Sequence, residues 1–188
     1  MAINILNIEQ KHISALISLS NRGLGKGYLT EAYFNRVLNH NNYYGWVVLN
    51  EEESVVAFLI AYQTSTPEII HKLNDDSLSS FFNQTTICLD TMVVDSKFRN
   101  KGLGKRLIQN ALTYFSSPTV GFIMYAWKTK GKTNMQRIAH FFNFKQLKEY
   151  PDLWKKDCLN NLFVCPEKAN NTCNCTTIIY YLHHYSKI

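Results

Sequence analysis

Arg99, Gly102 and Gly104 follow an alternating apolar run and precede a helical pattern, and their types and spacing suit phosphate binding. Glycines just before a helix let the backbone approach a ligand closely. The free amides of the first turn and the positive end of the helix dipole then attract an anion. The basic residues around this point are Lys97, Arg99, Lys101, Lys105 and Arg106. The spacing alone fits two interpretations equally well: an anion site, or a strand-to-helix turn with solvated basic side chains and no ligand.

The elements that would position this turn can be read from its flanks. Residues 87–94 alternate and are rich in β-branched side chains, which predicts a strand. From Leu103 to Phe115 apolar residues recur at helical spacing, which predicts a helix that begins near Leu103. Two familiar phosphate motifs are excluded. Leu107 stands where the dinucleotide motif has its third glycine, and no Gly-x-x-x-x-Gly-Lys-Ser/Thr occurs.

The remaining pattern, Arg-x-x-Gly-x-Gly after a strand, resembles the pyrophosphate loop of the GCN5-related N-acetyltransferase (GNAT) superfamily. The match extends backward through Met92, Val94 and Phe98 and forward through Leu107 and Ile108, while Ser96 stands where a proline is common. It covers about residues 87–127, and the rest of the chain fits in order and length alone. The resemblance implies acetyl-CoA as cosubstrate, bound by Met92, Val93, Val94, Arg99, Asn100, Lys101, Gly102, Leu103, Gly104, Lys105 and Asn134. Asn134 also fits a simple helix cap.

The resemblance further implies how acyl transfer would proceed. The strand ending at Val94 would splay from the next predicted strand, residues 120–127, and the pantetheine arm would lie in the gap. Backbone amides of residues 92–94 would polarise the thioester carbonyl. Asp90 is the candidate base, because plain alternation places it on the face of Met92 and Val94, although a structural carboxylate fits equally well.

The general acid of the family has no obvious counterpart in this chain. Relatives often carry a tyrosine on the helix after the fifth strand, and Ala139 stands at that position. Tyr125 is the candidate substitute and Tyr150 the alternative, although both also fit packed aromatics with surface hydroxyls. Thiolate departure without a protein acid stays open, with proximity as the main catalytic contribution.

A near copy of the turn, residues 22–27, reads Arg-Gly-Leu-Gly-Lys-Gly. Helical patterns lie on both sides of it, and no strand pattern precedes it. The sequence therefore predicts a connection between two helices there, which in the resembling family borders the acceptor pocket.

Four of the five cysteines crowd near the end of the chain, at Cys158, Cys165, Cys173 and Cys175. Close thiols in a cytoplasmic chain suggest zinc held by four thiolates, while a chance cluster of reduced thiols or a disulfide fits at least as well. One subgroup of the family carries Tyr-Pro-x-x-Trp, then Cys-Pro-x-Cys-Gly and Cys-x-Cys. Residues 150–154, 165–166 and 173–175 are similar to it, but Lys168 stands at the second cysteine, so Cys158 is the candidate fourth ligand.

The length and the order of the patterns predict one domain over residues 1–188, with a cysteine-bearing loop at about 155–176. Further strands are expected at residues 3–8, 45–49, 55–62, 144–150 and 176–182, two short helices before residue 40, and a helix over residues 134–142. Residues 63–86 are expected to be a polar insertion over a sheet edge with a short helix. This order predicts an α/β (α+β) fold with helices on both faces of a mixed sheet, which the resemblance makes mostly antiparallel.

The charge and the apolar runs bear on the class of protein. The net charge is +6, from 20 basic and 14 acidic side chains. The basic residues are dispersed, so the charge supports a phosphate-rich ligand weakly, and a nucleic-acid partner is not expected. Residues 55–62, the longest apolar run, are far short of the roughly 20 that span a bilayer. The first residues lack a secretion pattern, so a cytoplasmic location is the default expectation.

The sequence thus predicts an N-acetyltransferase that transfers an acetyl group from acetyl-CoA to a primary amine of a small molecule or peptide. Transfer would occur by direct attack in a ternary complex, in a monomer or homodimer. Two alternatives stay open: a non-catalytic CoA-binding regulator, and a zinc-stabilised nucleic-acid binder. A steep loss of oligonucleotide affinity with salt would indicate the latter.

Overall fold

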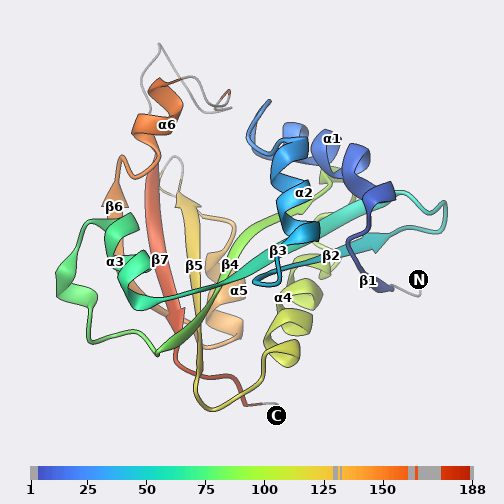
Figure 1. Ribbon diagram of the computed structural model, residues 1–188. Coiled ribbons are helices and arrows are strands. Elements are labelled where there is room, and N and C mark those ends of the chain that lie inside the picture. Colours follow the sequence, from blue (N-terminus) through green and yellow to red (C-terminus); the bar gives the residue numbers. More distant parts are fainter. Residues whose placement is uncertain (1–3, 129–130, 132, 161–163, 165–174, 187–188) are drawn as a thin grey trace.

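The structure is a computed structural model that describes residues 4–128, 131, 133–160, 164 and 175–186. Within these residues one sheet has the strand order β1-β2-β3-β4-β5-β7-β6 (Figure 1). The strands are β1 (Ile5–Asn7), β2 (Tyr43–Leu49), β3 (Val55–Thr64), β4 (Thr85–Val94), β5 (Val120–Lys128), β6 (Lys145–Pro151) and β7 (Thr176–Leu182). β4 and β5 are parallel, and the other neighbouring pairs are antiparallel. The predicted mixed, mostly antiparallel sheet is confirmed.

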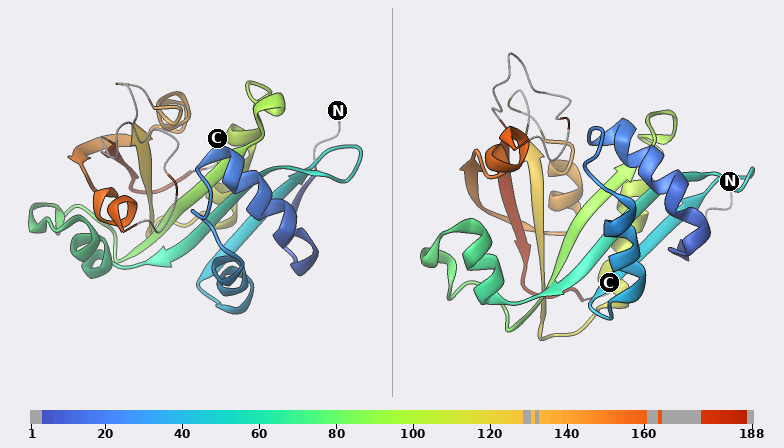
Figure 2. Two further views of the ribbon diagram at one scale, coloured as in Figure 1. Left: turned by 90° about the horizontal axis from the view of Figure 1, so that it is seen from above. Right: turned by 45° about the horizontal axis from the view of Figure 1, so that its top comes forward.

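Helices cover both faces of this sheet (Figure 2). On one face lie α1 (Ile13–Gly23), α2 (Glu31–Asn39) and α3 (Thr66–Leu73), and on the other lie α4 (Leu103–Tyr114) and α5 (Gln136–Phe141). Short 3-10 helices occur at Gln10–His12, Asp76–Leu78 and Ser96–Phe98. A five-residue helix, α6 (Lys155–Leu159), was not predicted, because it is too short to show a periodic pattern. No helix of the described chain is long and apolar enough to cross a membrane.

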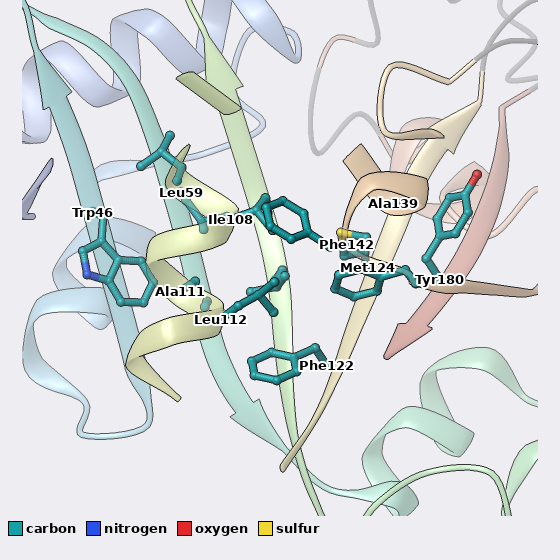
Figure 3. Packing of buried hydrophobic residues seen from close by; sticks show 14 of the residues in the cluster. Trp46, Leu59, Ile108, Ala111, Leu112, Phe122, Met124, Ala139, Phe142 and Tyr180 are labelled. Atoms are coloured by element: carbon teal, nitrogen blue, oxygen red, sulfur yellow. The ribbon is translucent and has the colours of Figure 1, made fainter. Parts of the chain in front are cut away.

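The main core lies between α4 and the middle of the sheet (Figure 3). Leu107, Ile108 and Leu112 of α4 are fully buried, as the helical spacing predicts. They pack in one cluster with Trp46 of β2 and Phe122 of β5. Burying each large apolar side chain contributes about 1.5–3 kcal/mol, so α4 is fixed firmly along the sheet. Its first turn is therefore held at the end of β4.

α3 forms the insertion between β3 and β4. Ser65 and Glu68 form a reciprocal capping box at its start. Its buried residues Ile69 and Leu73 pack in one cluster with residues of the interior strands β4, β5 and β7. The predicted helix is confirmed. Its apolar face covers interior strands, and Asp75 of the same insertion bonds Lys148 and Tyr150 of the edge strand β6.

Candidate active site

β4 and β5 pair along only part of their length. Their pairing runs from Thr85 with Val120 to Cys88 with Ile123, although β4 continues to Val94 and β5 to Lys128. Figure 1 shows the two ribbons separating toward their carboxyl ends. Among the described residues, no strand pairs with this edge of β4 beyond Cys88. Because successive residues point their amides to opposite edges, alternate amides of residues 91–94, beyond a register shift in β4, face the opening. The predicted splay of the two strands is confirmed.

The turn between β4 and α4 contains two residues in the left-handed backbone conformation. Asn100 has φ +61° and Gly102 has φ +79°, a conformation that glycine adopts at little cost. The side chain of Arg99 reaches back, and its Nε donates a hydrogen bond to the carbonyl oxygen of Val94 at 3.2 Å. The turn is thereby tied to the end of the strand.

The first turn of α4 presents unsatisfied amides beside this opening. Gly102 is the N-cap, no side chain caps the helix among the described residues, and the amide of Arg106 donates to the carbonyl oxygen of Gly102. The amides of Leu103, Gly104 and Lys105 precede that bond, so the helix itself offers them no acceptor. Such a helix end binds anions. The exposed ammonium groups of Lys101 and Lys105 add positive charge to it.

Gly104 packs against side chains of β4 and α5. A Cβ atom at this position would be 3.2 Å from Met92 Cε and 3.3 Å from Ile138 Cδ1. A larger residue would therefore crowd the contact between α4, β4 and α5. The structure thus brings the predicted loop residues 99–105 to the strand residues 92–94.

Asp90 lies in a β-bulge. Its neighbours Leu89 and Thr91 pair with two successive residues of β3, so Asp90 has no partner there. The extra residue reverses the alternation of faces. Asp90 hydrogen-bonds to a residue of α2 on one face, whereas Met92 and Val94 pack into the core under α4 on the other. The prediction that Asp90 shares a face with Met92 and Val94 is therefore wrong.

Two hydroxyl groups hold the carboxylate of Asp90. Tyr33 Oη of α2 donates to Oδ2 at 2.6 Å, and Thr91 Oγ1 donates to the same oxygen at 3.0 Å. Burial, followed by the charge of Asp90, raises the pKa of Tyr33 far above its usual range. The phenol therefore stays protonated and remains a donor.

Tyr125 lies opposite Asp90 where the strands separate. It is two residues past Ile123 on β5, as Asp90 is two residues past Cys88 on β4, and it packs on the same face as Cys88. Burial, with smaller contributions from Cys88 and Asp90, raises the pKa of Tyr125 well above its usual range. Lys72 of α3 places its Nζ 4.0 Å from the centroid of the Tyr125 ring. The structure thus brings together the two predicted catalytic side chains.

Sequence reasoning missed Tyr33 and Lys72 as members of this site. Tyr33 falls within one of the two short helices predicted before residue 40, and Lys72 falls within the predicted polar insertion at residues 63–86. Their long-range contacts leave no local pattern. The one available signal is Thr30, whose hydroxyl accepts from the amide of Tyr33 and fixes where α2 begins.

Three other side chains that bear on the site have defined places. Asn134 is exposed and does not cap α5, because Thr133 Oγ1 accepts the amide of Met135 at 3.2 Å instead. Ala139 is fully buried in the main core. The hydroxyl of Tyr150 donates a hydrogen bond to Asp75 Oδ2 at 2.5 Å. This bond anchors the α3 segment to β6.

The buried thiol of Cys88 does not take the role of a nucleophile. Burial, with a smaller contribution from Asp90, raises its pKa to about 12. The thiolate is the reactive form, so the raised pKa does not favour a nucleophilic role for Cys88 near neutral pH.

Only part of the cysteine cluster falls within the described residues. Cys158 and Cys175 are buried and pack together with Trp127. Cys165 and Cys173 lie outside the described residues. Within the described part of the chain, no group of three or more His, Cys, Asp or Glu side chains could hold a metal ion.

Comparisons with known proteins agree with this geometry. The model of the acetyltransferase (GNAT) family matches residues 13–144. A search of curated proteins finds no match. Arabidopsis thaliana NAA60 in complex with acetyl-CoA is similar in structure, with a TM-score of 0.70, 15% identity, and coverage of 96% of this chain and 98% of that one.

One bacterial structure and one animal structure are similar as well. The ribosomal-protein-S18-alanine N-acetyltransferase from Escherichia coli gives a TM-score of 0.65 at 11% identity, covering 99% of this chain and 96% of that one. The Drosophila melanogaster polyamine N-acetyltransferase gives 0.63 at 12% identity, covering 97% and 100%. At these identities the structures establish the shared fold.

Proposed function

The chain belongs to the acetyltransferase (GNAT) family, and we propose that it transfers the acetyl group of acetyl-CoA to a primary amine of a small molecule or peptide. The observation that carries this proposal is the separation of β4 from β5 directly beside the uncapped start of α4. An unpaired strand edge suits an extended amide-bearing arm, and a helix N-terminus suits the diphosphate at its end. Both parts of the CoA molecule thus find a matching surface.

The residues that would hold the cosubstrate divide into two groups. Alternate amides of residues 92–94 would bond the pantetheine arm, and the amides of residues 103–105 would bond the diphosphate. Lys101 and Lys105 would add electrostatic attraction. Asn134 is exposed at the start of α5, and we keep it as a proposed contact of the arm.

The proposed chemistry uses Asp90 of β4 and Tyr125 of β5, which lie where these strands separate. Asp90 would take a proton from the acceptor ammonium, since only the neutral amine has a lone pair for attack. The new N–C bond then forms as the C–S bond breaks, and a β4 amide stabilises the oxygen that gains charge. Such donors are worth about 2.7–4 kcal/mol where they have been measured. Tyr125 is protonated near neutral pH and would donate to the departing thiolate.

The names of the structural neighbours support an amine acceptor of either size. One is described as acting on a ribosomal-protein alanine and another as a polyamine N-acetyltransferase. A screen of amines, amino acids and short peptides with acetyl-CoA, read by mass spectrometry of the products, tests the proposal. Acetylation of no amine in a protein that binds CoA would favour a non-catalytic CoA-binding role.

Asp90→Asn tests the role of the base. The change keeps the shape of the side chain and removes its capacity to take a proton. We expect kcat to fall about a hundredfold or more, with the Kd for acetyl-CoA unchanged. A variant that keeps its kcat would reduce Asp90 to a structural carboxylate.

Zinc at the four cysteines stays a separate proposal. Its support is that Cys158 and Cys175, distant in sequence, lie in one buried cluster. Four thiolates would complete a closed structural site. Metal analysis of the purified protein, with Cys158→Ser as the matched variant, is expected to give one zinc per chain and its loss in the variant. Substoichiometric zinc in the unaltered protein would remove the metal from this account.

A further inference from the structure

The two donors to Asp90 both bind one of its oxygens. Tyr33 Oη and Thr91 Oγ1 lie 2.6 Å and 3.0 Å from Oδ2, while no group of the described residues donates to Oδ1. A carboxylate has room for about four donors, two on each oxygen. The occupied oxygen fixes the plane of the group, and the other oxygen is left to a ligand.

The bulge is what makes this arrangement possible. In a regular strand Asp90 and Thr91 would point to opposite faces of the sheet. Because of the extra residue, the side chains of Asp90 and Thr91 lie on the same face of the sheet, beneath the first turn of α2. Bulges are common beside active sites, where they redirect a side chain.

Tyr33 is itself held in place on several sides. Thr30 caps α2 by accepting the amide of Tyr33 at 3.3 Å. The ring packs edge-on against Phe34 and Tyr43, with centroids 5.7 Å and 6.5 Å away. A hydroxyl on a ring fixed in this way positions its acceptor more strictly than a solvated donor can.

Four buried phenol and thiol groups around Asp90 are neutral near pH 7. They come from the α1–α2 connection, β3, β4 and β5, and they are Tyr28, Tyr62, Cys88 and Tyr125. Burial raises the pKa of each of them, so none competes with Asp90 for a positive charge. Lys72, a cation on this face, lies over the Tyr125 ring. An alkylammonium group would therefore meet the Asp90 carboxylate among aromatic rings, which attract a cation, and Asp157, whose charge also acts on Tyr28, adds a second carboxylate nearby.

We propose that Tyr33 and Thr91 are positioning residues for Asp90, which fix Oδ2 so that Oδ1 receives the proton of an alkylammonium acceptor. This inference rests on the acetyl transfer proposed above. The N–H bond of the ammonium breaks, its proton passes to Oδ1, and the freed lone pair attacks the thioester carbonyl. Tyr33 takes no part in the proton transfer and acts through the orientation of Asp90.

Steady-state kinetics of Tyr33→Phe, with the best amine from the screen, test this inference. The variant keeps the ring and its packing and loses the hydroxyl alone. We expect kcat to fall about tenfold, as for a lost hydrogen bond to a charged group, with KM and Kd for acetyl-CoA unchanged. Thr91→Val is expected to lower kcat as well, and Thr91→Ser, which restores a hydroxyl, is expected to recover it.

Tyr43→Phe is the matched control, because Tyr43 neighbours Tyr33 and its hydroxyl forms no hydrogen bond within the described residues. It is expected to keep its kcat. Equal kcat values in Tyr33→Phe and Tyr43→Phe, with both variants binding acetyl-CoA normally, would overturn the inference while leaving the acetyl transfer intact. An unaltered protein that acetylates no amine would instead overturn the proposed function, so the two failures are distinguishable.

Discussion

The tetrapeptide Gly-Leu-Gly-Lys occurs twice, at residues 23–26 and 102–105, and the two copies lie at opposite ends of helices. The first copy begins at the last residue of α1, and the second leads into the first turn of α4. A helix presents carbonyl oxygens at its end and amides at its start, so the first copy repels an anion and the second attracts one. Which end of a helix the tetrapeptide adjoins, and not the tetrapeptide itself, therefore decides whether an anion can bind there.

The residues on either side of the first copy form contacts within the protein. The amide of Gly27 donates to Asn21 Oδ1 at 3.0 Å, and Arg22 forms an ion pair with Asp95 at 3.0 Å. A Cβ atom at Gly23 would lie 2.6 Å from Val93 Cγ1. The glycine there serves close packing of α1 on β4. The two copies therefore lie on opposite faces of one strand, with different roles.

Exchange of the second glycine of each copy for valine sharpens this contrast most. In Gly104→Val the new side chain crowds Met92 and Ile138 and displaces the first turn of α4 from the open edge of β4. Overpacking of this kind is expected to weaken CoA binding by about tenfold to a hundredfold, measured by isothermal titration calorimetry.

Gly25→Val is the matched control in the first copy. Gly25 has φ +115°, so valine there strains the backbone and lowers stability, but the folded protein is expected to bind CoA normally. The same loss of CoA affinity in both variants would show that the two copies do not differ in the way described.

Charge reversal of the lysine in each copy is expected to have a smaller effect. Lys105→Glu places a negative charge at the anion site, and we expect a loss of CoA affinity of about three- to tenfold that shrinks at high salt. Lys26→Glu, the equivalent change in the first copy, is expected to leave CoA affinity unchanged. A salt-independent effect would speak against an electrostatic role for Lys105.

Removal of the ion pair between Arg22 and Asp95 is expected to have the smallest effect. Arg22 is more than half exposed, at 56% of its side-chain surface, so solvent screens its attraction to Asp95. Arg22→Ala should therefore change the free energy of unfolding by less than about 1 kcal/mol in chemical denaturation. A loss of CoA affinity in this variant would mean that the first turn takes part in binding after all.

The sequence predicted the features that depend on local periodicity. The strand before Arg99, the helix after Gly102 and the connection at residues 22–27 are confirmed, because burial of one face imposes a regular spacing on each of them. The partial pairing of β4 and β5 was implied by the family resemblance and is confirmed as well.

The details of the site around Asp90 could not be predicted in the same way. One extra residue in β4 turns Asp90 to the other face, and a bulge of a single residue has no reliable signature in the sequence. Its partner Tyr33 lies 57 residues away in the chain, so their contact arises from the tertiary fold. The short helix α6 also lacks the length that a periodic pattern needs.

The central claim is that backbone amides at the start of α4 bind the diphosphate of CoA. An amide proton–nitrogen NMR titration with CoA tests it most directly, because it observes both copies of the tetrapeptide in one experiment. We expect large saturable shifts at Leu103, Gly104 and Lys105 and at alternate residues of 92–94. Shifts centred on residues 22–27, or no saturable shifts at residues 103–105, would contradict it.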